Sequence, residues 1–274
     1  MKILNVDGVR IEGESVSGLG TCIVIPSLDL VFDIGICTPA AIQCRNVLIS
    51  HSHIDHLAAA VQHAASRALH SMTPTRFFVP VVVAEKLKEL FVLWAKLQSD
   101  EVTPCEIIPL AVGETLALNK TLFIRPFKTD HRIPSQGYSI IERRNKLRAE
   151  FAALSGQEIA KLRQQQGVDV TEVTEVVQVV YTGDTRATIW DTIPEILEAR
   201  VIITEATFIG TEMTPEKASL RGHTHLSEIG ERAERFAAVH ALVLTHFSNR
   251  HSPKEIEQAA SELPEAIRQK TFLL

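Results

Sequence analysis

A cluster of four potential metal ligands constrains this chain more than any other feature of its sequence. His51, His53, Asp55 and His56 lie within six residues, directly after the apolar run 46–50. That run predicts a buried strand. Alternate side chains of an extended segment point to the same side, so His51 and His53 can converge on one metal ion. Asp55 and His56 follow the turn and can hold a second ion. Imidazole and carboxylate together suit zinc.

Further candidate ligands follow later in the chain. His131, Asp184 and His246 each come at or just after the end of an apolar, strand-like run. His223 and His225 form another pair of histidines. A single histidine at a strand end is more often a structural residue than a ligand. The shared position of the first three makes a common site at one rim of a sheet more probable, because ligands from several strand ends can meet there.

The remaining pattern predicts an α/β sandwich of two packed sheets with helices on the outer faces, in one domain over residues 1–274. Strands are expected over residues 21–26, 30–34, 46–50, 77–80, 121–127, 137–141, 177–182, 201–204 and 241–245, and helices over 56–71, 81–98, 156–166, 227–239 and 252–263. The last helix has Ser252 as N-cap, Pro253 next and Glu255 as the partner of a capping box. The polar stretch 143–174 is expected to be a helical excursion from the core.

Composition narrows the class of protein. The net charge of −5 argues against a protein that coats nucleic acid, which should be basic. An enzyme that acts on nucleic acid remains compatible with this charge, because a local patch can steer the substrate. No apolar run is long enough to span a membrane, and the first residues lack a signal-peptide pattern, so we expect a cytoplasmic protein. The four cysteines form no C-x-x-C pair and are expected to be reduced thiols.

The order of these motifs resembles the metallo-β-lactamase superfamily. Six longer segments resemble ribonuclease Z (the tRNA 3′-endonuclease), and its short, plant-type members most closely. They are residues 30–35, 131–138, 181–186, 204–208, 222–229 and 245–250. The resemblance runs through nearly the whole chain in order. It implies the αββα sandwich of that superfamily.

The resemblance also implies a centre that holds two Zn²⁺ ions, although the same ligands can hold Mn²⁺ or Fe²⁺. One ion would be bound by His51, His53 and His131, the other by Asp55, His56 and His246, and Asp184 would bridge both. Asp33 would lie behind the ligands and orient the histidine loop, as such ligands usually require.

Roles in catalysis follow from the same resemblance. Asp55 would be both a metal ligand and the general base. His223, oriented and kept protonated by Glu205, would be the general acid for the leaving 3′-oxygen, with His225 as a weaker candidate. Two more residues, Ser248 and Arg250, would hold a substrate phosphate.

The expected function is zinc-dependent removal of 3′ trailers from precursor tRNA, carried out by a homodimer. One alternative is a phosphodiesterase that acts on small or cyclic nucleotides or on another RNA. A second is a lactone, thioester or β-lactam hydrolase on the same scaffold. A non-catalytic RNA-binding protein would have lost ligands, and all seven ligand positions are intact.

Two departures from the family pattern affect how the substrate would be held. Ile54 stands where the family commonly has a glycine, and residues 59–62 replace a Gly-Leu-Pro-Gly run. Many members also carry a protruding arm, rich in Gly and Pro, that binds the tRNA elbow. The sequence shows no such insertion between Pro134 and Tyr181. The basic side chains of this region leave two interpretations open, a substitute for the arm or the solvated face of a helix. They are Arg143, Arg144, Lys146, Arg148, Lys161 and Arg163.

Overall fold

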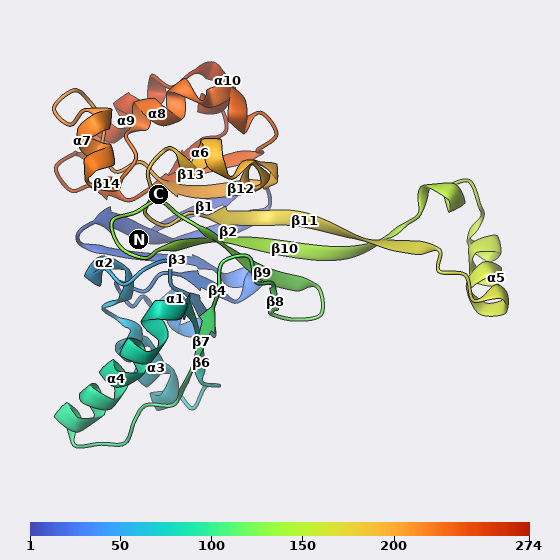
Figure 1. Ribbon diagram of the computed structural model, residues 1–274, viewed down its shortest axis with the longest axis horizontal. Helices are drawn as coiled ribbons and strands as arrows, with labels where there is room; N and C mark the ends of the chain where they lie inside the picture. Colours follow the sequence, from blue (N-terminus) through green and yellow to red (C-terminus); the bar gives the residue numbers. More distant parts are fainter.

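Two β-sheets pack face to face in the computed structural model, which describes residues 1–274 (Figure 1). The first sheet has the order β1 (Lys2–Val6), β2 (Val9–Ser17), β3 (Gly20–Ile25), β4 (Leu30–Phe32), β5 (Asn46–Leu48), β6 (Thr75–Pro80) and β7 (Cys105–Leu110), with β14 (Phe247–Ser248) paired to β2. The second has the order β15 (Thr271–Leu273), β13 (Ala241–Thr245), β12 (Val201–Glu205), β11 (Thr171–Tyr181), β10 (Gln136–Leu147), β9 (Leu122–Lys128) and β8 (Leu116–Ala117).

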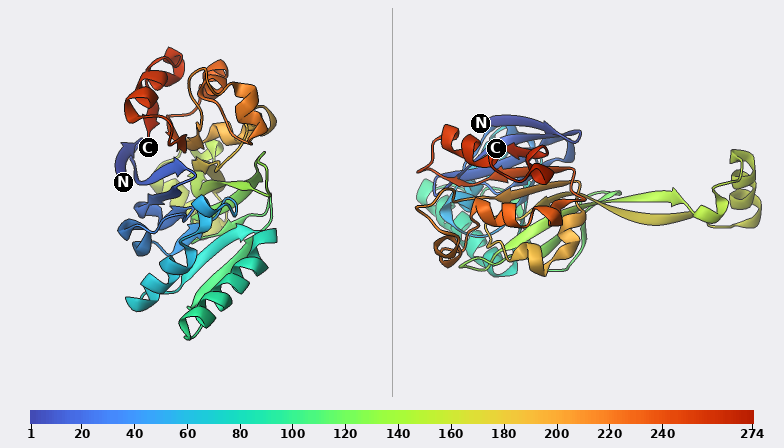
Figure 2. Two further views of the ribbon diagram at one scale, coloured as in Figure 1. Left: turned by 90° about the vertical axis from the view of Figure 1, so that its left-hand side faces the viewer. Right: turned by 90° about the horizontal axis from the view of Figure 1, so that it is seen from above.

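Helices cover the outer face of each sheet, so the molecule has four layers (Figure 2). The first sheet is covered by α1 (Pro39–Gln43), α3 (Ala60–Leu69) and α4 (Val81–Gln98), and α2 (Ile54–Leu57) lies at its edge. Over the second sheet lie α6 (Ile189–Thr192), α7 (Pro215–Leu220), α8 (Leu226–Glu231), α9 (Pro253–Ser261) and α10 (Glu265–Arg268). The expected two-sheet sandwich with outer helices is thereby confirmed.

Three apolar clusters hold these layers together. The central cluster has 20 buried residues from the facing sides of both sheets. A cluster of 18 lies between the first sheet and its helices, and one of 22 lies between the second sheet and its helices. Strands buried on both faces are continuous apolar runs, which is why β4, β5, β12 and β13 were visible in the sequence.

Several elements differ from the expectations. The segment expected as one helix over 56–71 is two helices, α2 and α3, because the chain turns at Ala59, whose N–H donates to the carbonyl of Ile34. The helix expected over 227–239 ends at Glu231 and continues as a 3-10 turn. Strands β1, β2 and β7 were not expected, because many of their residues are polar or partly exposed. The capping box at Ser252 is confirmed.

The largest correction concerns the region between Pro134 and Tyr181. Strands β10 and β11 continue past the sheet as a two-stranded hairpin, paired from Tyr138 and Tyr181 out to Leu147 and Thr171. It carries α5 (Gly156–Gln166) at its tip and protrudes far from the body (Figure 1; Figure 2, right). The expected absence of a protruding arm is therefore wrong.

The helix within this region was placed correctly, but the strands that carry it were taken for part of a helical excursion. Their outer halves have no core to cover, so both faces are exposed or half-buried and carry charged residues. Cross-strand pairing replaces burial there, as in the ion pair between Arg143 and Glu175. A pattern of hydrophobic alternation is absent for that reason.

No helix is long and apolar enough to pass through a membrane. All four cysteines are free, as expected.

Candidate metal centre

The candidate ligands gather at one edge of the sandwich, where strands of both sheets end. His51 and His53 follow β5, Asp55 and His56 lie on the short helix α2, and three further residues come at the ends of β9, β11 and β13 of the second sheet, namely His131, Asp184 and His246. Parallel strands end at the same edge of a sheet, which is why residues so distant in sequence meet.

The structure divides the candidates into overlapping groups that match the expected ones. In the first group the ligand atoms of His51, His53, His131 and Asp184 all lie within 4.8 Å of one another. In the second, the same holds for Asp55, His56 and His246. A third group combines Asp184 with His223 and His246.

Asp184 is the centre of the arrangement. Its Oδ2 lies 3.4 Å from Nε2 of His56 and 3.7 Å from Nε2 of His51, and its Oδ1 lies 3.4 Å from Nδ1 of His246. The carboxylate is buried, yet Oδ1 has no hydrogen-bond partner. A buried, unpartnered carboxylate oxygen is costly unless a cation or donor occupies the space beside it. This atom therefore fits a metal-bridging ligand.

The first group of histidines fits metal binding for a second reason. Burial lowers the pKa of His51, His53 and His131, so their imidazoles are neutral near pH 7. Neutral imidazole is the form that binds metals. The closest ring nitrogens, Nε2 of His51 and Nδ1 of His53, are 2.9 Å apart. This donor set of imidazoles and carboxylates is one that zinc prefers.

Asp33 lies directly behind the histidine loop, as expected. It is fully buried and accepts hydrogen bonds from the Ser50 N–H and hydroxyl and from Nδ1 of His56, each at 2.7 Å. The Tyr181 hydroxyl donates to it at 2.5 Å. Because the Nδ1–H of His56 donates to Asp33, Nε2 is the ring nitrogen that faces the centre.

Asp55 reaches the second group from α2. The N–H of Gly18 donates to its Oδ2 at 2.7 Å, and the same oxygen lies 3.4 Å from Nε2 of His246. Burial opposes ionisation, but the hydrogen bond with His246, the nearby His56 and the Gly18 N–H together lower the pKa of Asp55. The carboxylate is therefore ionised at neutral pH.

His223 and Glu205 form a pair beside the ligands. Nδ1 of His223 lies 3.1 Å and 3.2 Å from the two carboxylate oxygens of Glu205, which is buried. Burial alone would lower the pKa of His223, but the charge and hydrogen bond of Glu205 outweigh it and raise that pKa to about 9. The ring also lies 5.1 Å from that of His131. His223 is thus a protonated group next to the ligands.

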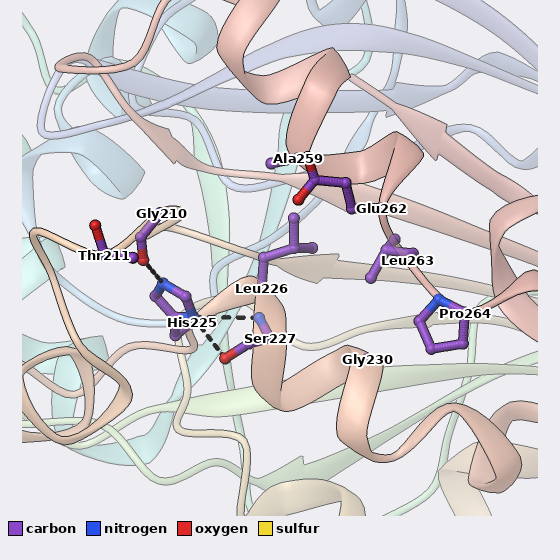
Figure 3. Close-up of a pocket in the computed structure, with 10 residues that line it drawn as sticks. All are labelled: Gly210, Thr211, His225, Leu226, Ser227, Gly230, Ala259, Glu262, Leu263 and Pro264. Carbon is purple, nitrogen blue, oxygen red and sulfur yellow. Dashed lines mark hydrogen bonds between the residues drawn. The ribbon is translucent and has the colours of Figure 1, made fainter.

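His225 lies outside this cluster. Its Nδ1 is 2.8 Å from the Ser227 hydroxyl and its Nε2 is 3.0 Å from the carbonyl oxygen of Gly210 (Figure 3). It serves as the N-cap of α8 and lines a cavity of about 390 Å³ together with Gly210 and Leu263. Both ring nitrogens are engaged, so the geometry favours His223 over His225 as the proton donor.

Ser248 and Arg250 lie on the segment that follows His246. The Ser248 N–H donates to the carbonyl of Thr207 at 2.8 Å, which ties this segment to the loop that follows Glu205. Arg250 is exposed, and its guanidinium makes no hydrogen bond or ion pair within the chain. It lines a cavity of about 1010 Å³ that Phe208 also borders.

Several residues of the site were not found from the sequence. The hydroxyl of Thr207 contacts Glu205, His223 and His246, although only its place two residues after Glu205 could have suggested it. Gly35 allows α2 to approach, because a Cβ there would lie 1.9 Å from the carbonyl oxygen of Asp55. Gly18 gave no local signal at all, since its role depends on a contact across 37 positions.

The chain is similar to known proteins over its whole length. A family model described as a beta-lactamase superfamily domain matches residues 38–247. The chain is 38% identical over 275 residues to tRNase Z TRZ1 of Arabidopsis thaliana, covering 100% of this chain and 97% of that protein. It is also 38% identical to the chloroplastic tRNase Z TRZ2 of the same plant, over 100% of this chain and 77% of that one.

Solved structures show the same fold at low identity. Human short-form tRNase Z matches with a TM-score of 0.65 and 18% identity, over 97% of this chain and 95% of that one. The metallo-beta-lactamase fold protein YhfI from Bacillus subtilis matches with a TM-score of 0.67 and 17% identity, over 97% and 96%.

Proposed function

Because the chain belongs to the tRNase Z (ribonuclease Z) family of the β-lactamase superfamily, we propose that it is a zinc-dependent endoribonuclease that removes 3′ trailers from precursor tRNA. The metallo-β-lactamase sandwich expected for this family is confirmed by the two-sheet architecture and by its structural neighbours. The observation that carries the proposal is the meeting of seven intact ligand residues with a His223–Glu205 pair at one edge of the sandwich.

We assign His51, His53 and His131 to one divalent ion, Asp55, His56 and His246 to the other, and Asp184 to both. When bound, two such ions supply a water molecule of lowered pKa and positive charge beside the scissile phosphate. Zn²⁺ is the metal we assign to both positions, because five of the seven ligands are imidazoles and two are carboxylates, a donor set that zinc prefers.

The side chains of the chain itself move the protons. Asp55 is ionised and uses Oδ2 for Gly18 and the histidines, so its other oxygen can accept a proton from the attacking water. His223 gives its proton to the leaving 3′-oxygen. Glu205 raises the pKa of His223 to about 9, so the ring carries that proton near neutral pH.

The phosphates on either side of the cut need cationic or hydroxyl partners. The guanidinium of Arg250 is exposed and has no partner within the chain. The main-chain N–H of Arg250 donates to the Ser248 hydroxyl at 3.4 Å, so the two residues lie side by side. A guanidinium can bind a phosphate through two parallel hydrogen bonds. We therefore assign both residues to substrate phosphate binding.

The hairpin of β10 and β11 with α5, which we call the arm, supplies a second contact for a large RNA. Its basic residues are not equivalent. Arg143 and Arg144 are paired with Glu175 and Glu142 near its base. At the tip, Lys161 and Arg163 are exposed and form no ion pair. The free positive charge therefore lies far from the metal centre, where only an extended substrate such as tRNA could reach both.

The arm also favours precursor tRNA over small or cyclic nucleotides as the substrate. The expected absence of an arm and the acidic net charge were the two reasons to consider small or cyclic nucleotides, and the first of them no longer holds. A small nucleotide could not contact Lys161 or Arg163 at the tip and the metal centre at the same time (Figure 1).

We further propose that the protein is a homodimer whose interface is the outer face of α3 and α4. Helix α4 is apolar around most of its surface. It buries Val83, Leu87 and Phe91, and it exposes Leu93 at 54%, Trp94 at 45% and Leu97 at 70% of their surface. Trp94 borders a groove of about 1140 Å³ between the two helices, which is also lined by Leu90, Ile54 and Leu69.

Exposed apolar patches of this kind mark protein interfaces. Ile54 is 77% exposed and lies between His53 and Asp55, so a second copy seated here would also form a wall of the catalytic cleft. That position explains why an apolar residue can replace the family's glycine.

The proposed activity is tested by incubating the metal-loaded protein with a precursor tRNA that has a 3′ extension and mapping the ends of the products. We expect a single cut near the discriminator base that is lost on chelation. His53→Ala should abolish it, because His53 contributes Nδ1 to the first group. No cut, with a simple phosphodiester still hydrolysed, would contradict the tRNA substrate but not the two-metal chemistry. Full activity in His53→Ala would contradict the ligand assignment.

A further inference from the structure

We propose that Arg186 is a positioning residue that fixes His131 and His223 relative to Asp184. The inference rests on the proposed function, because it concerns the same site. Arg186 follows Asp184 by two residues but does not point at the metal ligands. Its guanidinium instead joins the two loops that carry His131 and His223, which come from different parts of the chain.

The guanidinium makes two well-directed contacts. Its Nη1 donates to Oδ1 of Asp130 at 2.5 Å, and its Nε donates to the carbonyl oxygen of Ser219 at 2.6 Å. The main-chain N–H of Arg186 also donates to the carbonyl of Asp130 at 2.9 Å. Asp130 is bonded in turn by the Thr188 hydroxyl at 3.2 Å. Arg186 thus bonds the Asp130 loop through both its side chain and its backbone, and the Ser219 turn through its side chain.

Each contact lies next to a functional residue. Asp130 directly precedes His131, and Ser219 belongs to the turn that leads into His223, since the Gly222 N–H donates to the same Ser219 carbonyl at 2.9 Å. The two loops also meet each other, because Nδ1 of His131 donates to the carbonyl of Gly222 at 2.7 Å. A shift of the Ser219–Gly222 turn would therefore move His223 and would also remove the partner that orients His131.

The two loops pack closely against each other at Gly222. Gly222 has a φ of +82°, and a Cβ there would lie 2.8 Å from Nδ1 of His131 and 2.9 Å from Cγ of Arg132. The loops are thus in direct contact on one side, and Arg186 joins them on the other. Contacts on both sides therefore restrict the movement of His131 and His223 relative to each other, and catalysis is sensitive to misplacements of about 1 Å.

The chemistry requires arginine at this position. A guanidinium presents N–H donors in a rigid plane, so Nε and Nη1 can serve two acceptors at once. A lysine ammonium is a single centre on a flexible stem and cannot reproduce both directions. The side chain of Arg186 is 23% exposed and that of Asp130 is 53% exposed. An ion pair so open to water adds little to stability, which indicates that its contribution is positional.

Arg232 is a matched control within the same chain. Its Nε donates to a carboxylate oxygen of Asp191 at 3.0 Å and its Nη1 donates to the carbonyl of Glu228 at 3.1 Å, and it is 24% exposed. It therefore loses the same kinds of contact when replaced, but it bonds no loop that carries a candidate ligand.

The experiment compares Arg186→Met, Arg186→Lys and Arg232→Met with the unaltered protein, all loaded with Co²⁺ as a spectroscopic substitute for zinc. For Arg186→Met we expect kcat on precursor tRNA to fall about 10- to 100-fold, the usual cost of losing a residue that supports metal ligands, with KM little changed. We also expect an altered visible Co²⁺ spectrum, because His131 is displaced. Arg186→Lys should resemble Arg186→Met, and Arg232→Met should resemble the unaltered protein.

A rescue experiment separates positioning from general damage. Guanidinium at low millimolar concentration should restore part of the activity of Arg186→Ala, and ammonium at the same ionic strength should not. An unchanged Co²⁺ spectrum and kcat in Arg186→Met, or full activity in Arg186→Lys, would overturn the inference. A failure of the unaltered protein to cut tRNA would instead count against the proposed function, and the Co²⁺ spectra would still test the role of Arg186.

Discussion

At the scale of single residues, hydrogen bonds select which nitrogen each histidine turns toward the centre. Nδ1 of His51 is bonded to Ser50, that of His56 to Asp33, that of His131 to Gly222 and that of His223 to Glu205. In all four rings Nε2 is therefore the nitrogen that remains available. His53 differs, since its Nδ1 faces His51 and His131.

Asp33 gives the first prediction at this scale. Asp33→Asn keeps the shape but turns one acceptor into a donor that meets the N–H or O–H groups of Ser50, His56 or Tyr181. We expect the dissociation constant for zinc to rise about 10- to 100-fold, measured by competition with a chelating dye. Asp29→Asn is a matched control, because Asp29 precedes β4 with a φ of +53° and Asp33 follows β4 with a φ of +55°. Equal zinc affinities in both variants would contradict the role of Asp33.

A second prediction at this scale distinguishes His223 from His225 as the proton donor. His223→Ala should lower kcat on precursor tRNA about 10²- to 10⁴-fold, as loss of a general acid does. His225→Ser keeps an N-cap for α8 and should stay within about threefold of the unaltered protein. A loss of less than about tenfold in His223→Ala would exclude it as the acid, and a large loss in His225→Ser would reverse the assignment.

At the scale of elements, the arm can be removed without disturbing the sheet. Glu142 and Val176 are directly opposite each other in the register, so residues 143–175 can be replaced by an Asn-Gly turn between them. We expect KM for precursor tRNA to rise about tenfold or more, because the basic contacts of the tip are lost. Hydrolysis of a small chromogenic phosphodiester should be unchanged.

A charge change at the tip separates the length of the arm from its chemistry. Lys161→Glu combined with Arg163→Glu keeps α5 and the hairpin but reverses the free charge. It should raise KM for tRNA and weaken its dependence on salt concentration. If neither the deletion of the arm nor the charge reversal changes KM for tRNA, the arm does not take part in substrate binding.

Helix α3 carries a pH-sensitive element of stability. His63 is fully buried between Ala41 and Thr75. Burial lowers its pKa from 6.5 to about 4, although the carbonyl of Ala41 opposes this. The unfolded chain therefore binds a proton at higher pH than the folded chain does, so stability falls as the pH drops below about 6.5.

Between pH 7 and pH 5, this linkage should cost about 2 kcal/mol of unfolding free energy. Between the same two pH values, the unfolding free energy of His63→Gln should therefore fall by about 2 kcal/mol less than that of the unaltered protein. Urea unfolding at both pH values measures the difference. His70→Gln, at an exposed histidine just after the same helix, serves as the control. Identical pH dependence in His63→Gln and the unaltered protein would contradict the assignment.

At the scale of the whole molecule, four layers leave one apolar face uncovered, the face of α3 and α4. A chain of 30.3 kDa should therefore have twice that mass by light scattering at micromolar concentration. Trp94→Glu should shift the protein toward the monomer. Val112→Glu, at an apolar side chain that is 53% exposed elsewhere, should not. A monomeric unaltered protein would contradict the proposed interface.

The sequence by itself determined the ligand types, most of the core strands and the family. These signals are local: four ligands within six residues, apolar runs that make buried strands, and the capping box at Ser252. Local patterns survive without knowledge of the fold, because side-chain chemistry and strand periodicity act over a few residues.

Only the tertiary structure decided how the ligands are oriented and how the substrate is reached. The contact of Gly18 with Asp55, the joining of two loops by Arg186 and the arm formed by β10 and β11 all depend on residues brought together from distant positions. The arm was not predicted from the sequence, because the outer parts of its strands bury no face. Cross-strand pairing stabilises them, and this leaves no hydrophobic alternation in the sequence. The arm is therefore the part of the proposed tRNA contact that could not be predicted from the sequence.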